Sequence, residues 1–142
     1  MLPDSLTVFT DASHDAHCYR HAVAEACRLL GRLSIRTALA SAPAAEGVFS
    51  LRLGRATASV PPLSLQGVVF DGFRLAVDAD GIAIVAASPK GVLNGVYELA
   101  ERLGFVFLLP GESGEWAPAK PAPLPVGEAL LNPRFPFRGV FA

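Results

Sequence analysis

The chain has 142 residues, of which 51% are hydrophobic and 18% are charged, and its net charge is −1 at pH 7. This length suits one domain, which can bury about two-thirds of its unfolded surface without disulfides or metals. A nearly neutral chain with no block of Lys or Arg lacks the positive surface that nucleic-acid binding needs. This lack of positive charge excludes nucleic acid as a partner. No apolar run approaches the roughly 18 residues of a membrane span, which excludes insertion into a membrane.

Composition also bears on the neighbours and the compartment of the chain. The charged share is below the usual value of about a quarter, so we expect another domain to cover part of the surface. The first residues, Met1–Asp4, lack the basic start and apolar core of a signal peptide. They predict a cytoplasmic protein, or a secreted one whose native signal has been removed. Cys18 and Cys27 lie on one predicted helix about 13 Å apart, too far for a disulfide, and free thiols fit a reducing compartment.

The first half of the sequence predicts three strands and one long helix. Strands are expected over residues 6–10, 35–39 and 48–53, where β-branched or alternating apolar residues occur. Residues 55–71 contain two adjacent prolines and no stable period, and they predict a loop. Residues 13–33 have helical spacing and place one apolar face together, formed by Cys18, Ala22, Ala26, Leu29, Leu30 and Leu33.

Residues 73–109 predict a strand, a turn, a strand, a helix and a strand in succession. Phe73, Leu75 and Val77 alternate with more polar residues, and Asp80-Gly81 is typical of a tight hairpin turn. Residues 82–87 are apolar without a break, which predicts a central strand covered on at least part of both faces. Residues 105–109 are expected to form a further short strand.

The helix within this stretch carries a start and a stop signal. Ser88 is a good N-cap, and Pro89 suits the first helical position, where its missing N–H would have no partner. Gly104 supplies a left-handed C-terminal residue. Gly91 and Gly95 lie inside the helix at a propensity cost of about 1 kcal/mol each, so we expect them to pack closely against a strand.

The C-terminal part of the sequence is rich in proline. Residues 110–136 carry seven of the twelve prolines and predict an extended, stiff connector. The apolar, strand-like residues 135–141 lie directly before the last residue, Ala142, and from this we expect a truncated polypeptide. Together the elements predict an α+β fold, a two-layer sandwich of a mixed sheet of about five strands with two helices on one face, followed by a Pro-rich C-terminal tail.

One stretch resembles a known kind of domain. Phe73-Arg74-Leu75, the apolar strand 82–87, the segment 88–99 with the pattern S-P-x-G-x-x-x-G-V-Y-x-L, and Leu103-Gly104-Phe105 resemble the N-terminal accessory domain, the hexosaminidase domain 2-like domain, of β-N-acetylhexosaminidases and α-glucuronidases. The likeness covers about 40 residues well and about 120 weakly. It implies a sheet whose two helices lie between the sheet and a catalytic barrel.

The resemblance also implies a division of the chain and a function. Residues 1–109 would be a non-catalytic accessory domain, and residues 110–142 a Pro-rich linker with the start of a missing barrel. The parent enzyme would be a glycoside hydrolase that acts on carbohydrate. Arg138-Gly139 resembles the start of the first barrel strand in β-N-acetylhexosaminidases, where the arginine contacts the sugar. Arg138 would therefore bind substrate only in the complete enzyme.

Other residues point to alternative functions. His14, His17 and His21 have a spacing that could present three imidazoles to a metal, although a solvated helix face is the simpler interpretation, and we expect no cofactor. A stand-alone binding or dimerisation module without hydrolase activity remains an alternative, and self-association through residues 135–141 is possible.

Residues typical of glycosidase chemistry are also present. A glycosidase needs paired carboxylates, and Glu98/Glu101 and Glu112/Glu115 are candidates that we interpret as solvated, so no catalytic residue is assigned. Trp116 with Phe105 and Phe107 would suit sugar stacking or ordinary packing.

Overall fold

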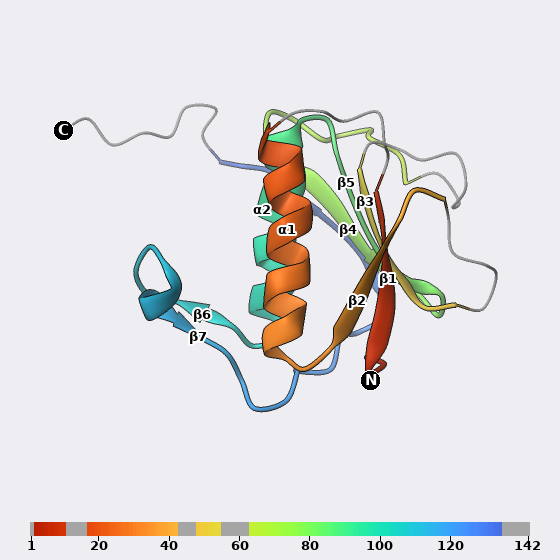
Figure 1. Ribbon diagram of the computed structural model, residues 1–142. Helices are drawn as coiled ribbons and strands as arrows, with labels where there is room; N and C mark the ends of the chain where they lie inside the picture. Colours follow the sequence, from red (N-terminus) through yellow and green to blue (C-terminus); the bar gives the residue numbers. More distant parts are fainter. Residues whose placement is uncertain (1, 11–16, 43–47, 55–62, 135–142) are drawn as a thin grey trace.

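A computed structural model describes residues 2–10, 17–42, 48–54 and 63–134, and it confirms the α+β fold. Two helices cover one face of a mixed sheet, as Figure 1 shows. This sheet has six strands, one more than the five expected. A second, two-stranded sheet lies on the far side of the helices from the main sheet (Figure 1). The arrangement is therefore two layers with a small additional hairpin.

The order of strands in the main sheet is β2-β1-β3-β5-β4-β8. Strands β2, β1, β3 and β5 are parallel, whereas β4 is antiparallel to both β5 and β8. In the described residues the elements are β1 Ser5–Thr10, α1 His17–Arg32, β2 Arg36–Ala40, β3 Ser50–Gly54, β4 Phe73–Val77, β5 Gly81–Ala86, α2 Pro89–Arg102, β6 Val106–Phe107, η1 Glu112–Gly114, β7 Glu115–Trp116 and β8 Gly127–Leu131.

The core lies between the sheet and the two helices. Every residue of β5 is buried, as its unbroken apolar run predicted. Alternate residues of the neighbouring strands face the helices, and Val8, Leu51 and Leu75 are no more than 1% exposed. Removing this apolar surface from water is the main force that holds helices and sheet together.

The signals predicted for α2 are confirmed. The hydroxyl of Ser88 accepts a hydrogen bond of 3.0 Å from the backbone N–H of Gly91. A Cβ placed on Gly95 would lie 2.3 Å from Cγ2 of Ile84, so the helix reaches β5 closely only because this residue has no side chain. Gly104 has a φ of 102°, and its backbone N–H donates to the carbonyl of Glu101 at 2.9 Å. This left-handed residue ends the helix.

Three expectations about the elements are corrected. The predicted strand over residues 105–109 is only the two residues of β6, and it pairs with β7 outside the main sheet. The Pro-rich segment contributes β8, which pairs with β4. At the start of α1 the buried residue is Tyr19, whose hydroxyl donates to the carbonyl of Leu53 at 2.8 Å, while Cys18 is exposed. The rest of the predicted face is largely confirmed, because Ala22, Ala26, Leu29 and Leu30 are buried, and the correction applies to Cys18 at the start of the helix.

Neither described helix is long and apolar enough to cross a membrane. Residues 135–141, the apolar end with its proposed role in self-association, lie outside the described residues. The same holds for Arg138.

Candidate functional site

A cluster of five polar side chains joins α1, α2 and the hairpin. Arg28 of α1 lies at its centre. Its Nε and one Nη donate to the two carboxylate oxygens of Glu25 at 2.8 Å each. Its Nη1 and Nη2 also donate to Glu115 of β7 at 2.8 and 2.6 Å. Arg32 adds a bond of 2.8 Å to Glu115, and the hydroxyl of Tyr97 donates to Glu25 at 2.9 Å.

Both carboxylates of this cluster are largely removed from water. The side chain of Glu25 is 11% exposed and that of Glu115 is 8% exposed. Hydrogen bonds from Arg28 hold the pKa of each carboxyl below its usual value, in spite of burial, which acts in the opposite direction. Burial, together with the hydrogen bond to Glu25, raises the pKa of Tyr97 to about 12. At neutral pH both acids are therefore ionised and Tyr97 is neutral.

The local sequence explains how the cluster forms. Residues three and four apart are neighbours on a helix, so Glu25, Arg28 and Arg32 share one side of α1. In the hairpin, Phe107 pairs with Glu115, and this pairing directs both side chains to the same face. The ring of Phe107 meets Tyr97 edge-on with centroids 5.3 Å apart and stacks on Phe105 at 6.0 Å. The hairpin is therefore fastened by ion pairs and by aromatic contacts.

These contacts correct the interpretation of the carboxylate pairs. Glu115 was expected to be solvated, but two arginines hold it in a nearly buried position. Glu98 pairs with Arg102 at 2.8 Å. A general acid in a glycosidase needs a raised pKa, whereas the two carboxyls of the cluster have lowered ones. The cluster is therefore suited to holding structure and not to acid catalysis.

Two open hollows flank the outer side of α2. The larger, with a volume of about 400 Å³, lies between the helix and the hairpin and includes Tyr97, Glu101, Phe107 and Leu108. The smaller, about 280 Å³, lies between α2 and the end of β8 and also includes Tyr97 and Glu101. Both are open depressions over a helix surface.

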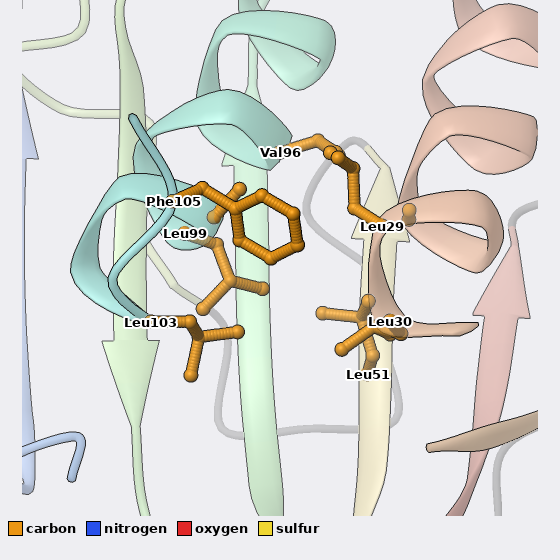
Figure 2. A pocket seen from close by; sticks show the side chains of 9 residues that line it. Leu29, Leu30, Leu51, Val96, Leu99, Leu103 and Phe105 are labelled. Atoms are coloured by element: carbon orange, nitrogen blue, oxygen red, sulfur yellow. The ribbon is translucent and has the colours of Figure 1, made fainter. Parts of the chain in front are cut away.

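The interior between helices and sheet contains a further space, which Figure 2 shows. Its lining is wholly apolar, and its volume of about 10 Å³ is at the limit for a single water molecule. Since its lining offers no polar group to bind a water, we interpret this space as a packing defect of the core. The side chains that surround it include Leu29, Leu30, Leu51, Val96, Leu99, Leu103 and Phe105.

The residues proposed for a metal site are only partly described. His17 and His21 lie exposed on α1, and His14 lies outside the described residues. Within the part of the chain that the structure describes, no three His, Cys, Asp or Glu side chains are placed to hold a metal ion.

The aromatic platform is not formed. Phe105 is 3% exposed and belongs to the core, while Trp116 is 57% exposed. Trp116 pairs with Val106, and the neighbouring pair is Phe107 with Glu115, so Trp116 and Phe107 point to opposite faces of the hairpin. The three rings cannot bind one sugar together.

Sequence reasoning missed the cluster around Arg28. The spacing Glu25-x-x-Arg28 on a helix was the available signal, but it is common on solvated helix faces. The decisive partners, Tyr97 and Glu115, lie 72 and 87 residues from the groups they bind.

This chain is similar to known proteins in its three-dimensional structure, whereas the sequence comparisons found no match. No protein-family model and no curated protein sequence matches the chain. Among solved structures, a GH138 enzyme targeting pectin rhamnogalacturonan II is similar over 70% of this chain, with a TM-score of 0.51 and 13% sequence identity. CpGH84D is similar over 81% of this chain, with a TM-score of 0.54 and 11% identity.

The matched part is a small share of both neighbours. It makes up 13% of the GH138 chain and 19% of CpGH84D. At sequence identities this low, the structural match shows a likeness of fold alone. The proteins that share this fold include glycoside hydrolases. The α+β fold of this chain is thus one that occurs as a minor part of much longer glycoside hydrolase chains.

Proposed function

We propose that this chain is a non-catalytic, N-terminal domain of a glycoside hydrolase and that it supports a larger catalytic domain of the same polypeptide. The observation that carries the proposal is the likeness of its fold to 13% and 19% of two glycoside hydrolase chains. The motif pattern of residues 73–105, which resembles accessory domains of hexosaminidases and glucuronidases, agrees with it. Carbohydrate would be the substrate of the complete enzyme.

The chemistry of the described carboxylates supports a non-catalytic role. Glycoside hydrolysis needs one carboxylic acid that is protonated near neutral pH and a second carboxylate across the sugar. Glu25 and Glu115 are both held ionised by Arg28. Glu98 is paired with Arg102 on the surface of α2. Neither Glu25 nor Glu115 therefore offers a proton to a leaving group near neutral pH.

The structure bears on where such a domain would end. Strand β8 belongs to the main sheet, because Phe73 to Val77 pair with Leu131 to Gly127 along their whole length. We therefore place the connection to the catalytic domain after Leu131. In this proposal residues 110–131 complete the accessory domain, and the chain beyond them leads to the first strand of the barrel, with Arg138 near its start.

Hydrolysis assays of the isolated chain test the non-catalytic role. We expect no turnover of a panel of aryl-glycosides by the 142-residue chain at any pH between 4 and 8. Turnover that a single substitution such as Glu101→Gln abolishes would contradict the proposal, because it would place a catalytic carboxylate in this domain.

A further inference from the structure

The hairpin and its tip, residues 106–116, form an arm that is fastened to the helices at its base and projects beyond them at its tip. It lies beyond the two helices on the side opposite the main sheet (Figure 1). Four large apolar side chains of this short segment are exposed, and those of Leu108 and Leu109 are 75% and 69% exposed. The other two are Val106 and Trp116.

Backbone contacts close the tip of the arm, residues 108–114. The N–H of Leu108 donates to the carbonyl of Gly114 at 2.9 Å, and the N–H of Gly114 donates to the carbonyl of Gly111 at 3.0 Å. A Cβ on Gly114 would lie 2.3 Å from the carbonyl oxygen of Leu109, so the loop closes this tightly only with glycine there. At the base of the arm, Arg28 and Arg32 hold Glu115. A loop whose backbone is already closed loses less conformational entropy when its exposed apolar side chains bind a partner.

The charges near the tip distinguish between possible partners. Glu112 lies within the tip, and Glu101 of α2 borders the hollow that Leu108 also lines. Among the described residues, neither carboxylate has an ion pair or a side-chain hydrogen bond. A second copy joined by a twofold axis through the tip would bring Glu112 close to Glu112, and like charges at a contact are unfavourable. A surface that carries Lys or Arg around an apolar depression is complementary.

We infer that Leu108 and Leu109 seat the catalytic domain of the same polypeptide, in an apolar depression rimmed by basic residues that pair with Glu101 and Glu112. This inference rests on the proposed function, in which the fold is a minor part of a much longer chain. The cluster around Arg28 sets the position of the arm relative to the helices. The arm is thus the contact through which the small domain fixes the orientation of the large one.

Thiol labelling at the tip tests the inference. Leu109→Cys is introduced both into the native full-length polypeptide and into the 142-residue chain, and the rate of maleimide labelling is read from the peptide that contains position 109. We expect labelling to be about tenfold slower or more in the full-length polypeptide, because the tip opens only when the domains separate. Leu39→Cys on β2, which is also exposed at 66%, is the matched control and labels at the same rate in both.

Three other results of the labelling experiment would contradict the inference. Equal labelling at position 109 in a full-length polypeptide that is an active glycoside hydrolase would overturn the inference and leave the proposed function intact. Slow labelling in the 142-residue chain that depends on protein concentration would assign the tip to a second copy. A native polypeptide with no further domain would overturn the proposed function and the inference together.

A charge at the tip gives an independent measurement. Leu109→Asp leaves the thermal midpoint of the 142-residue chain unchanged within about 2 °C, because the side chain is exposed. In the full-length polypeptide the same substitution separates the domains, and limited proteolysis cuts between them at least about tenfold faster. Equal proteolysis of Leu109→Asp and the control Leu39→Asp would contradict the inference.

Discussion

The guanidinium of Arg28 and the carboxylate of Glu115, 87 residues apart, meet through two hydrogen bonds of 2.8 and 2.6 Å. The same guanidinium binds Glu25 on its own helix. One side chain therefore joins the helix layer to a hairpin that lies outside the two main layers. Because bidentate arginine–carboxylate contacts fix geometry as well as contribute energy, this pair sets the orientation of the hairpin.

The first prediction concerns this pair. Glu115→Gln removes a charge that two arginines bind and leaves Arg32 without its carboxylate partner. We expect a loss of about 1–3 kcal/mol in the free energy of unfolding, measured by urea denaturation. Glu112→Gln is the matched control, because Glu112 is exposed, and it should change stability by less than about 0.5 kcal/mol. Equal effects of the two substitutions would mean that the cluster does not fasten the hairpin.

The second prediction concerns acid stability. The pKa values of Glu25 and Glu115 are lowered in the folded state through their hydrogen bonds to Arg28. A lowered folded-state pKa contributes stability above the unfolded value and loses it as the pH falls through the folded value. Stability should therefore decrease as the pH falls below about 4.5. In Glu115→Gln this decrease should be smaller than in the parent, and an unchanged slope would contradict the assignment.

The third prediction concerns the alkaline side. The pKa of Tyr97 is raised from 10.0 to about 12, first by burial and then by the hydrogen bond to Glu25. A raised folded-state pKa contributes stability below the unfolded value and loses it as the pH rises through the folded value. Stability should therefore fall between about pH 10 and 12, and Tyr97→Phe should reduce this slope. Tyr19→Phe, at the other tyrosine, is the comparison that shows whether the effect is specific to the cluster.

The fourth prediction tests the close contact between α2 and β5. A Cβ on Gly95 would lie 2.3 Å from Ile84, so Gly95→Ala should destabilise by about 1–3 kcal/mol although alanine favours helices. Gly31→Ala, within α1, meets no atom within 4 Å and should stabilise by up to about 1 kcal/mol. Chemical denaturation of both variants measures the difference. Stabilisation by both would mean that α2 lies farther from the sheet.

The fifth prediction concerns the alternative metal site. His17 and His21 are exposed on α1, and we expect neither EDTA nor added zinc to change the thermal midpoint. A metal bound only by the folded state at a hundredfold over its dissociation constant would add about 2.7 kcal/mol. A shift of that size with zinc, lost in both His17→Ala and His14→Ala, would support a metal-dependent protein instead.

The sequence predicted the elements whose signals are local. Ser88, Pro89 and Gly104 marked both ends of α2 because capping depends on neighbouring backbone groups. The unbroken apolar run of β5 predicted a strand covered on at least part of both faces, and every residue of β5 is buried. Such features need no knowledge of distant residues.

Features that depend on distant contacts could not be predicted. Strand β8 follows a Pro-rich stretch that is typical of a connector, and it becomes a strand because β4 offers an unpaired edge. Periodicity placed Cys18 in the core, but adjacent Tyr19 is buried because its hydroxyl reaches the carbonyl of Leu53. The burial of Glu115 depends on Arg28, 87 residues away. Each of these outcomes is decided by tertiary pairing.

The size of the native polypeptide tests the central proposal most directly. Antibodies against the 142-residue chain recover the native protein from its source cells, and mass spectrometry measures its intact mass and maps its peptides. We predict a polypeptide that continues for several hundred residues beyond position 142 and hydrolyses a glycoside. A native polypeptide of about the 14.9 kDa of this chain would contradict the proposal that it is one domain of a glycoside hydrolase.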